Sequence, residues 1–420
     1  MKFIADFHVH SRFSRATSQK LDLENLYIAA QLKGITVVGT GDFTHPQWFL
    51  EISEKLVPAE DGLYRLKKNI AAVCDKAVPI SCRSKVRFVL TTEISNIYKK
   101  GDKTRKNHNL VVVPDIETAA RFSERLGAIG NIHSDGRPIL GLDAKKLLEI
   151  LIETSEESFL IPAHIWTPWF SVMGSKSGFD SIEECFEELS EYIFAVETGL
   201  SSDPAMNWRV SCLDKYTLIS NSDAHSPMNL GREANIFNTD LSYRQIFLAI
   251  KNRNPEKFLG TYEFYPEEGK YHFDGHRNCR VRFSPKESIQ NKGICPQCEK
   301  PLTLGVLYRV EELADRPLNG MPEKHPPFYS AIPLTDILAE ILQVGPKSKT
   351  VQNHYRILLD KFGSEYNILH GISTETIERS GATRLAEAIS RMRRGELSIY
   401  SGYDGEFGKI QIFNPGEREK

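Results

Sequence analysis

Histidines and carboxylates recur in short segments of the first 225 residues, each where a β-strand is expected to end. The segments are Asp6-Phe-His8-Val-His10, Gly41-Asp42, Thr92-Glu93, Pro162-Ala-His164 and Ser222-Asp223-Ala-His225, with a further histidine, His108, at the start of another strand-like run. Imidazoles and carboxylates that converge from several strand ends can hold more than one divalent cation. The sequence therefore predicts a polynuclear metal centre and metal-assisted hydrolysis.

Any one of these segments is weak evidence. His8-Val-His10 taken alone also fits two histidines that meet solvent or a loop carbonyl. The metal interpretation gains weight because several ligand types occupy equivalent strand ends. His45 precedes Pro46 and is either a further ligand or part of a turn.

Length and composition describe a multidomain globular protein. At 420 residues, two or three domains are expected. The chain is 40% hydrophobic and 26% charged, as globular proteins usually are. We expect a cytoplasmic protein without membrane association, because no apolar run reaches the ~18 residues of a membrane span and no signal peptide is visible. With a formal net charge of −2, any surface for nucleic acid must be local.

Residues 1 to about 260 alternate between apolar runs and amphipathic stretches. Buried strands are predicted at Phe3–Phe7, Ile35–Gly39, Val86–Thr91, Leu110–Val113, Phe159–Ile161, Phe194–Glu197 and Thr217–Ser220. Helices are predicted at Leu23–Lys33, Ile116–Leu126, Ala144–Ile152, Ile182–Leu189, Pro204–Leu213 and Tyr243–Lys251. Seven strands separated by helices favour a parallel α/β barrel or an open sheet, with the chemistry at the carboxyl ends of the strands.

The pattern changes near Gly260. A cysteine cluster follows, then a proline-rich connector over 312–330, and helical periodicity begins after Pro333. Helices are predicted at Leu334–Leu342, Thr350–Phe362, Thr374–Ser380 and Ala382–Arg394. We therefore expect domains over residues 1–262, 263–315 and 330–420.

The cysteine cluster predicts one structural zinc ion. Cys295-Pro-Gln-Cys298 places two thiolates on one turn, and His276-Arg-Asn-Cys279 supplies a second pair at the same spacing. Four protein ligands leave no open position for chemistry. The alternatives are a redox Cys-x-x-Cys motif and His272 as the fourth ligand.

The strand-end motifs together resemble those of the PHP (polymerase and histidinol phosphatase) superfamily. The resemblance implies a distorted (β/α)7 barrel with two or three divalent ions, Zn²⁺, Mg²⁺ or Mn²⁺, and phosphoester hydrolysis. It implies one ion on His8, His10, Glu93 and Asp223, which would form the catalytic core. Glu93 would bridge to a second ion on His108 and His164, and Asp42 and His225 would serve a third. Arg15 and the displaced His45 depart from the usual pattern.

The whole chain more specifically resembles the endonuclease Q family. This resemblance rests on His10-Ser-Arg-Phe-Ser-Arg-Ala16, Pro162-Ala-His-Ile-Trp-Thr-Pro-Trp169, Leu230-Gly-Arg-Glu233 and the downstream zinc and helical segments. It implies a DNA repair enzyme that cuts 5′ of hypoxanthine, uracil, xanthine and abasic sites, with base flipping. We expect a monomer at the nucleoid, and a sliding clamp or a helicase is an additional candidate partner.

DNA contacts are predicted beside the metal ligands. Trp166, Trp169 and Phe170 follow His164 and could stack on a base, although the tryptophans could equally pack in the core. Arg12, Arg15 and Arg232 lie close to ligands and could bind phosphates. Two other functions stay open: a small-molecule phosphatase, and a non-catalytic, helicase-associated DNA-binding protein.

Overall fold

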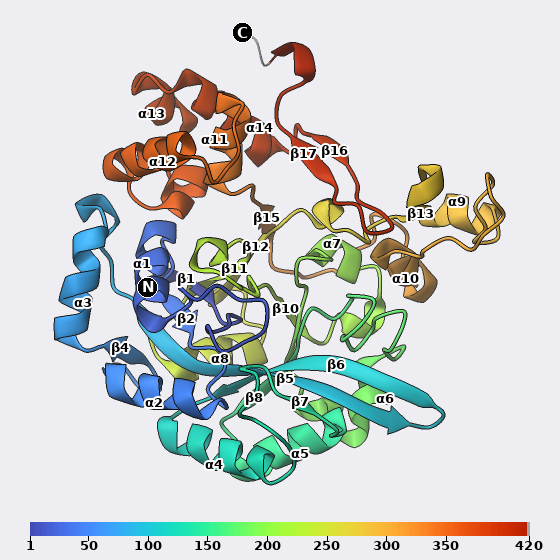
Figure 1. The fold of residues 1–420 in the computed structure, drawn as a ribbon, viewed down its shortest axis with the longest axis horizontal. Coiled ribbons are helices and arrows are strands. Elements are labelled where there is room, and N and C mark those ends of the chain that lie inside the picture. The colour runs from blue at the N-terminus through green and yellow to red at the C-terminus, as the bar shows by residue number, and fades with distance from the viewer. Residues whose placement is uncertain (418–420) are drawn as a thin grey trace.

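The computed structural model describes residues 1–417 and has a mixed α/β architecture. An eleven-stranded sheet forms its centre, and helices surround it (Figure 1). The predicted α/β class is confirmed. The last three residues, which belong to the predicted C-terminal domain, lie outside the described part of the chain. Within residues 1–417, no helix combines the length and hydrophobicity that crossing a membrane requires.

All seven predicted strands are present, with altered ends. They are β1 (Lys2–Asp6), β2 (Val37–Gly39), β5 (Arg87–Lys100), β6 (Lys103–Val113), β8 (Phe159–Pro162), β9 (Ala195–Glu197) and β10 (Thr217–Ile219). β1, β2 and β5 are parallel neighbours, whereas β9 and β10 form a separate parallel pair that packs beside β8. The carboxyl ends of β1 and β10 meet, because Val9 and Ala224 form a parallel bridge just beyond them.

The direction of β6 differs from the prediction. β5 and β6 are antiparallel and form one long hairpin. Only Gly101 and Asp102 separate them, so the chain has no room for the crossover that a parallel pair needs. Glu93 consequently lies within β5 rather than at its end, and His108 lies within β6 opposite Ser95.

The sheet also contains strands that the sequence pattern did not reveal. They are β3 (Leu56–Pro58), β4 (Tyr64–Leu66), β7 (Ile139–Leu140), β11 (Ala234–Asn238), β12 (Phe258–Glu263) and β15 (Phe328–Ser330). β11 pairs antiparallel with β1 and with β12, and β15 extends this edge. The sheet is therefore mixed, whereas the pattern of strands and helices had favoured parallel strands.

Helices pack around the strands of this first part. They are α1 (Leu23–Lys33), α2 (Pro46–Lys55), α3 (Lys68–Cys74), α4 (Ile116–Gly127), α5 (Ala144–Thr154), α6 (Ile182–Phe186), α7 (Pro204–Asn207) and α8 (Tyr243–Lys251). Two are shorter than predicted. α6 ends at Phe186 because Glu187 has a φ of 54°, and α7 ends at Asn207, before a separate 3-10 turn over 211–213.

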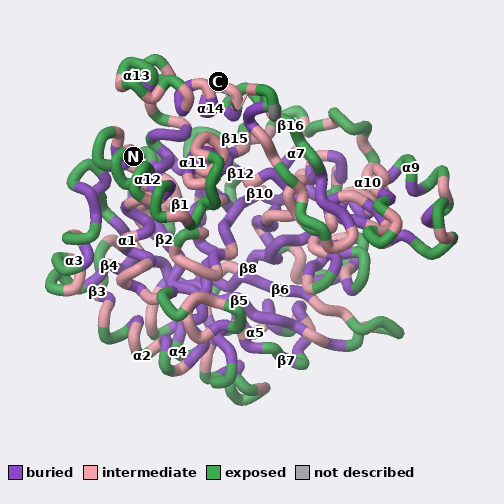
Figure 2. Tube along the Cα trace, turned by 45° about the horizontal axis from the view of Figure 1, so that its top comes forward, coloured by how far each residue is buried: buried purple, intermediate pink, exposed green. Residues whose placement is uncertain are grey.

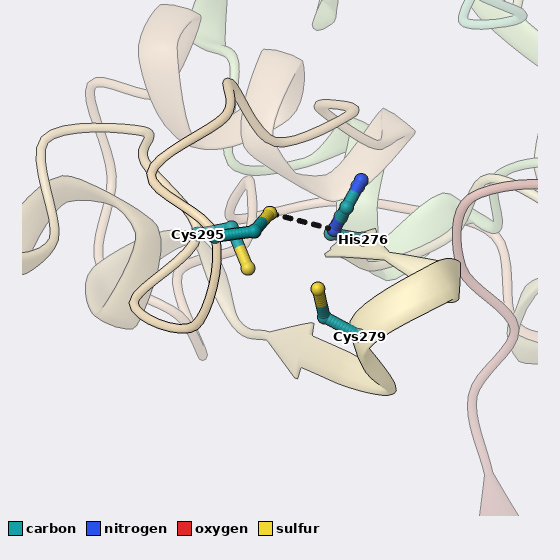
Figure 3. A group of neighbouring side chains, drawn as sticks. His276, Cys279 and Cys295 are labelled. Carbon is teal, nitrogen blue, oxygen red and sulfur yellow. Dashed lines mark hydrogen bonds between the residues drawn. The ribbon is translucent and has the colours of Figure 1, made fainter.

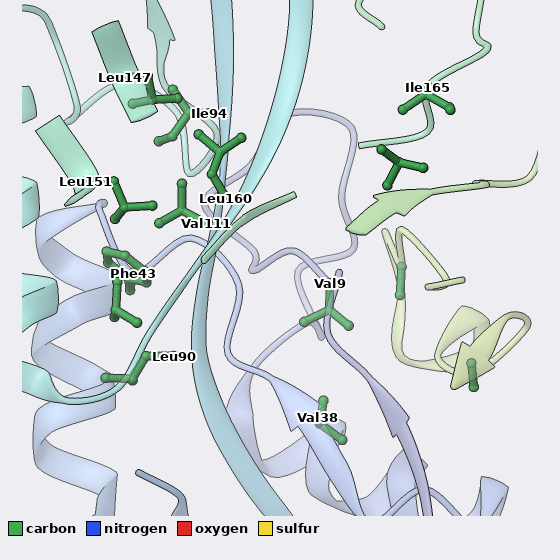
Figure 4. Close-up of a cluster of buried hydrophobic side chains, with 14 of the residues drawn as sticks. Val9, Val38, Phe43, Leu90, Ile94, Val111, Leu147, Leu151, Leu160 and Ile165 are labelled. Carbon is green, nitrogen blue, oxygen red and sulfur yellow. The ribbon is translucent and has the colours of Figure 1, made fainter. Parts of the chain in front are cut away.

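Apolar side chains on both faces bury the central strands. One cluster joins Val38, Leu90 and Val111 to Leu147 and Leu151 of α5 (Figure 4). The interior of the trace is mostly buried, and exposed residues concentrate at the periphery (Figure 2). This packing gives the loops beyond the strand ends a rigid base.

The second half adds a cysteine-bearing module and a helical domain. The module contains β13 (Asp274–His276), β14 (Val281–Phe283), α9 (Pro285–Gln290) and α10 (Val306–Leu313). The helical domain contains α11 (Leu334–Leu342), α12 (Lys349–Phe362), α13 (Thr374–Arg379), α14 (Thr383–Arg394) and the hairpin of β16 (Ser398–Tyr400) and β17 (Lys409–Gln411). The hairpin tip reaches the module, where Asp404 accepts hydrogen bonds from Arg277 N–H and the Thr303 hydroxyl (Figure 1).

Candidate metal centre

The first group of candidate ligands comes from the loops after β1 and β10. His10 Nε2 lies 3.0 Å from Asp223 Oδ1, and His8 Nε2 lies 3.8 Å from the same oxygen. One ligand atom from each of these residues lies within 4.8 Å of the others. The bridge between Val9 and Ala224 explains this proximity, since it aligns the two loops.

The second group is centred on Glu93. Its Oε1 lies 2.9 Å from His108 Nδ1 and 3.1 Å from His164 Nε2. The same oxygen lies 3.5 Å from His8 Nε2, and Oε2 lies 3.5 Å from His10 Nε2. Glu93 therefore faces both groups, as a carboxylate that bridges two cations must.

Three of the predicted metal ligands have a left-handed backbone. The φ angle is 48° at Asp42, 30° at His164 and 46° at Asp223. This conformation is uncommon outside glycine and costs ~1–3 kcal/mol per residue. Gly199 leaves room for His164, because a Cβ at Gly199 would lie 2.4 Å from His164 Cβ. Strain of this kind is typical of functional sites.

Two buried carboxylates hold the ligand loops in place. Both oxygens of Glu197 lie 3.0 Å from His8 Nδ1, which directs Nε2 to the centre, and Oε2 accepts the backbone N–H of His164 at 2.9 Å. Asp6 accepts the N–H groups of Ser222 and Gly231 and so fixes the loop of Asp223. Glu197 was absent from the predicted ligands, although it ends a predicted strand and the same signal could have identified it.

Arg137 is a further site residue that the sequence did not reveal. Its Nη1 donates to Glu93 Oε2 at 2.9 Å. The preceding Gly136 donates its N–H to the Phe13 carbonyl, and a Cβ at Gly136 would lie 2.3 Å from Asp42 Oδ2. Arg137 comes from a loop without a recognisable motif, so only the fold places it here.

Asp42 and His225, predicted to serve a third ion, lie outside both groups among the described residues. Asp42 Oδ1 lies 3.1 Å from His10 Nδ1, and Oδ2 accepts from Ser11 and Ser14. Asp42 thus orients His10. His225 Nδ1 lies 2.9 Å from the Asp223 carbonyl, and its ring packs against His10 with centroids 4.6 Å apart.

His45 and His272, which the sequence left open as possible metal ligands, lie outside the ligand groups. His45 Nε2 lies 3.0 Å from the His133 carbonyl, and the His45 ring stacks on Phe13. His272 is buried and is absent from the cysteine-containing ligand group. Within residues 1–417, neither belongs to a group of converging ligand atoms.

The electrostatics of the centre favour cations. Although burial opposes protonation, the carboxylates of Glu197 and Glu93 raise the pKa of His8. Burial likewise opposes ionisation of Glu93, but His108, Arg137 and His8 lower its pKa. His8 Nε2 is buried and has no hydrogen-bond partner. These imidazoles and carboxylates fit the divalent ions that the sequence implies.

The predicted zinc ligands also lie together. His276, Cys279, Cys295 and Cys298 each offer a ligand atom within 4.8 Å of the others, and Figure 3 shows the labelled side chains around a common point. Cys298 Sγ lies 3.4 Å from His276 Nδ1. Although burial opposes ionisation, the N–H groups of Gln297 and Cys298 lower the pKa of the Cys295 thiol to about 7. Three sulfurs and one nitrogen suit a tetrahedral zinc ion.

The predicted aromatic DNA contacts divide into two kinds. Trp166 is fully buried and donates its indole N–H to Asn207 at 2.8 Å, so the prediction that it contacts DNA is wrong. Its large apolar ring contributes more as core than at the surface. Trp169 is 45% exposed, and Phe170 packs on His108 with ring centroids 4.9 Å apart.

The three predicted arginines have different environments. Arg12 forms an ion pair with Glu51, whereas the Arg15 side chain is 81% exposed. Arg232 Nε donates to the Ser222 carbonyl at 2.9 Å and therefore braces the loop of Asp223. Of the three, Arg15 has the most surface free for a phosphate.

Curated relatives cover different shares of the chain. Residues 333–396 match the family model of the MJ0043 C-terminal domain. The uncharacterized protein MJ0043 of Methanocaldococcus jannaschii is 34% identical over 262 residues, which is 60% of this chain and 32% of that protein. The chain thus spans about a third of the length of MJ0043. The uncharacterized protein YqxK of Bacillus subtilis is 30% identical over 427 residues, which is 98% of this chain and 99% of that protein.

A solved structure is similar over the full length. It is the lesion-specific endonuclease PfuEndoQ from Pyrococcus furiosus, with a TM-score of 0.85 and 31% identity over 100% of this chain and 97% of that one. The chain belongs to the endonuclease Q family. A structure of endonuclease Q with a 27-mer duplex substrate that carries an abasic lesion at the active site has a TM-score of 0.83 and 31% identity, over 99% of this chain and 97% of that one. This protein, with its two candidate ligand groups around Glu93, is thus a member of the endonuclease Q family.

Proposed function

We propose that this protein is a metal-dependent DNA repair endonuclease that hydrolyses the phosphodiester on the 5′ side of a damaged nucleotide. The observation that carries the proposal is Glu93, whose two oxygens face two groups of metal-type ligands in a member of a lesion-specific endonuclease family. The proposed substrates are abasic sites and the deaminated bases hypoxanthine, uracil and xanthine, the bases being extruded from the duplex.

The ligand assignment follows the two groups. One ion is held by His8, His10, Asp223 and Glu93, and a second by Glu93, His108 and His164. When bound, such ions activate water and neutralise phosphate charge. Glu197 and Asp42 keep the histidines of the first group oriented, and Arg137 places a positive charge beside Glu93. His225, which packs on His10, is the candidate ligand for a third ion with Asp42 behind it.

Further parts of the proposal concern the rest of the chain. The seven strands predicted from the sequence form a distorted PHP-type barrel, and His276, Cys279, Cys295 and Cys298 hold a structural zinc ion. Trp169, Phe170, Arg12 and Arg15 face the DNA, together with the helical domain that begins near residue 330. A monomeric state, a cytoplasmic location at the nucleoid and a sliding clamp or helicase as partner stay predictions.

An incision assay tests this function. Purified protein is incubated with Mg²⁺, Mn²⁺ or Zn²⁺ and end-labelled duplexes that contain inosine, uracil, an abasic site or only normal bases. The expected result is a nick 5′ of the lesion and intact normal duplex. Asp223→Asn should lower incision by at least ~100-fold, because a ligand carboxylate is lost. Asp240→Asn, at an exposed position, is the matched control.

The same assay separates the alternatives. Hydrolysis of free phosphomonoesters without nicking would support a small-molecule phosphatase. Tight binding of duplex without any hydrolysis would support a non-catalytic DNA-binding protein. The second alternative is disfavoured because both ligand groups are complete among the described residues.

A further inference from the structure

A buried asparagine, Asn221, lies between the segments that carry the candidate metal ligands. It is fully buried and follows β10, two residues before Asp223. Its Oδ1 accepts the backbone N–H of Phe7 at 2.8 Å, directly before His8, and its Nδ2 donates to Glu197 Oε1 at 2.9 Å. One amide therefore joins the segments at the carboxyl ends of β1, β9 and β10.

Backbone groups fix which way the Asn221 amide faces. The N–H of Phe7 can only donate, so the amide oxygen must face it and the NH2 group must face Glu197. Asn235 adds a second constraint. Its Oδ1 accepts the N–H of Ser220 and its Nδ2 donates to the Ser220 carbonyl, so that Nδ2 also faces Asn221 Oδ1 at 2.9 Å. The opposite orientation would place donor against donor at Phe7 and acceptor against acceptor at Glu197.

The direction of these hydrogen bonds continues to two candidate metal ligands. A carboxylate only accepts, so Glu197 must receive hydrogens from all its neighbours. These neighbours are Asn221 Nδ2, His8 Nδ1 at 3.0 Å and the backbone N–H of His164 at 2.9 Å. His8 therefore carries a hydrogen on Nδ1 and turns Nε2 to its ligand group, where Nε2 has no hydrogen-bond partner.

We propose that Asn221 is a positioning residue of the candidate metal centre, and that it sets the hydrogen-bond direction which leaves His8 Nε2 free for a cation. The contacts run from a backbone N–H through Asn221 to Glu197, and from there to one ligand in each group, His8 and His164. Partners beyond the direct ligands fix the ring orientation and the basicity of a metal-bound histidine. The inference rests on the proposed endonuclease function, since that function needs both groups loaded.

Exchanging the carboxylate and the amide tests this direction. In Asn221→Asp, two acceptors face each other, so Glu197 must rotate or take up a proton. In Glu197→Gln, the His164 N–H keeps the amide oxygen on its own side, so two NH2 groups face each other. In the double variant Asn221→Asp, Glu197→Gln, the amide at position 197 donates to the carboxylate at position 221, and its oxygen still accepts from His8 and His164. Donors and acceptors match again, while the net charge stays the same.

Manganese binding is the first measurement. Mn²⁺ suits imidazole and carboxylate better than the cysteine-containing group, because thiolates select softer ions. It is titrated into protein from which the metals of the candidate centre have been removed, and calorimetry gives the dissociation constant. We expect this constant to rise by roughly 10–100-fold in each single variant, as is usual when a metal-bound histidine loses its partner. The double variant should bind at least about tenfold more tightly than either single variant.

Asn96→Asp is the matched control. Asn96 is also fully buried and donates its Nδ2 to a backbone carbonyl, that of Leu142, at 2.9 Å. It lies on the face of β5 opposite Glu93, because side chains alternate along a strand. This variant buries a carboxylate in the same way and should bind Mn²⁺ as the wild type does. Thermal melting checks that every variant is folded.

Incision kinetics give a second measurement. The single variants should show a lower kcat and an unchanged KM for lesion duplex, because the affected side chains are buried and contact ligands only. Wild-type Mn²⁺ affinity in folded Asn221→Asp, or a double variant that binds no better than Glu197→Gln, would overturn the proposal. If Asn221→Asp does not fold, the comparison of Glu197→Gln with the double variant decides. A wild type that binds Mn²⁺ and cuts no lesion would refute the endonuclease function, whereas the binding ratios would still decide the role of Asn221.

Discussion

At the scale of single residues, three of the candidate ligands are each held by a second polar group. The His8 ring contacts the Glu197 carboxylate, and the His10 ring contacts the Asp42 carboxylate. Glu93 accepts a hydrogen bond from Arg137. Such partners fix the ring orientation and the charge of a ligand before a cation arrives. Arg137 was not predicted, because it comes from a loop without a recognisable motif, whereas Glu197 ends a predicted strand and could have been identified.

Arg137→Met tests the partner of the bridging carboxylate. The change removes the guanidinium that donates to Glu93 at 2.9 Å, so Glu93 is held less firmly between the two groups. We expect incision to fall by roughly 10–100-fold and the metal concentration for half-maximal rate to rise. Arg125→Met on the outer helix α4 is the matched control, and equal activity of both variants would contradict the role of Arg137.

Glu263 predicts a pH dependence of stability. Burial raises the pKa of its carboxyl from 4.5 to about 8, while Ser220, Thr261 and Thr198 surround it with hydroxyls. The folded state thus holds a proton that the unfolded state releases near pH 4.5. The contribution to stability is complete below pH 4.5 and declines as pH rises to about 8, by up to ~1.4 kcal/mol per pH unit.

Glu263→Gln removes this titration and keeps a neutral side chain of the same shape. Its melting temperature should fall less than that of the wild type between pH 5 and pH 8, measured by differential scanning calorimetry at matched ionic strength. Parallel curves for the two proteins would show that Glu263 is ionised in the fold and that the assignment is wrong.

At the scale of elements, the cysteine-bearing module depends on its ligands more than on packing. Its buried apolar cluster consists of Val281, Cys295 and Leu302, with three partly buried neighbours. So small a core stabilises a fold only weakly. On the proposed assignment, an ion held by His276 and the three cysteines supplies most of the order of this module.

Cys295→Ser or a strong chelator should disorder this module. We expect one zinc ion per wild-type chain by metal analysis, and none at this site in the variant. Hydrogen exchange should become fast over residues 276–303, while the strands around Glu93 stay protected. Cys212→Ser, at an exposed cysteine outside the ligand group, should behave as wild type. Unchanged protection of residues 276–303 from hydrogen exchange in Cys295→Ser would mean that packing alone keeps the module folded.

At the scale of the whole molecule, a buried ion pair joins α1 to the helical domain. Lys33 at the end of α1 lies 2.8 Å from Glu365 Oε2, with side-chain exposures of 6% and 4%. Glu365 also accepts from the Tyr355 hydroxyl at 2.7 Å and from Leu334 N–H at 3.0 Å. This network fixes the helical domain against α1.

Lys33→Met should destabilise the protein by ~3–5 kcal/mol, because it leaves the Glu365 carboxylate buried without a cation. Urea denaturation measures the loss. The double variant Lys33→Met, Glu365→Gln should recover part of it, since no buried charge is then unpaired. A single variant as stable as the wild type would show that water reaches Glu365 and that the pair contributes little.

The sequence alone determined the residue types of the site and the elements that carry them. Alternating apolar runs located seven strands, and the histidines and acids near them indicated the candidate ligands and the kind of chemistry. Local patterns suffice to locate such elements, because a buried strand and its end are visible as a change in hydrophobicity over a few consecutive residues.

Only the tertiary structure decided which side chains meet. It placed Glu93 between two groups through an antiparallel hairpin, brought Arg137 to Glu93 from a loop, buried Trp166 and left Trp169 beside the module. These outcomes depend on contacts between segments far apart in the chain. Their energies come from packing and desolvation in three dimensions, which no local pattern of residues records.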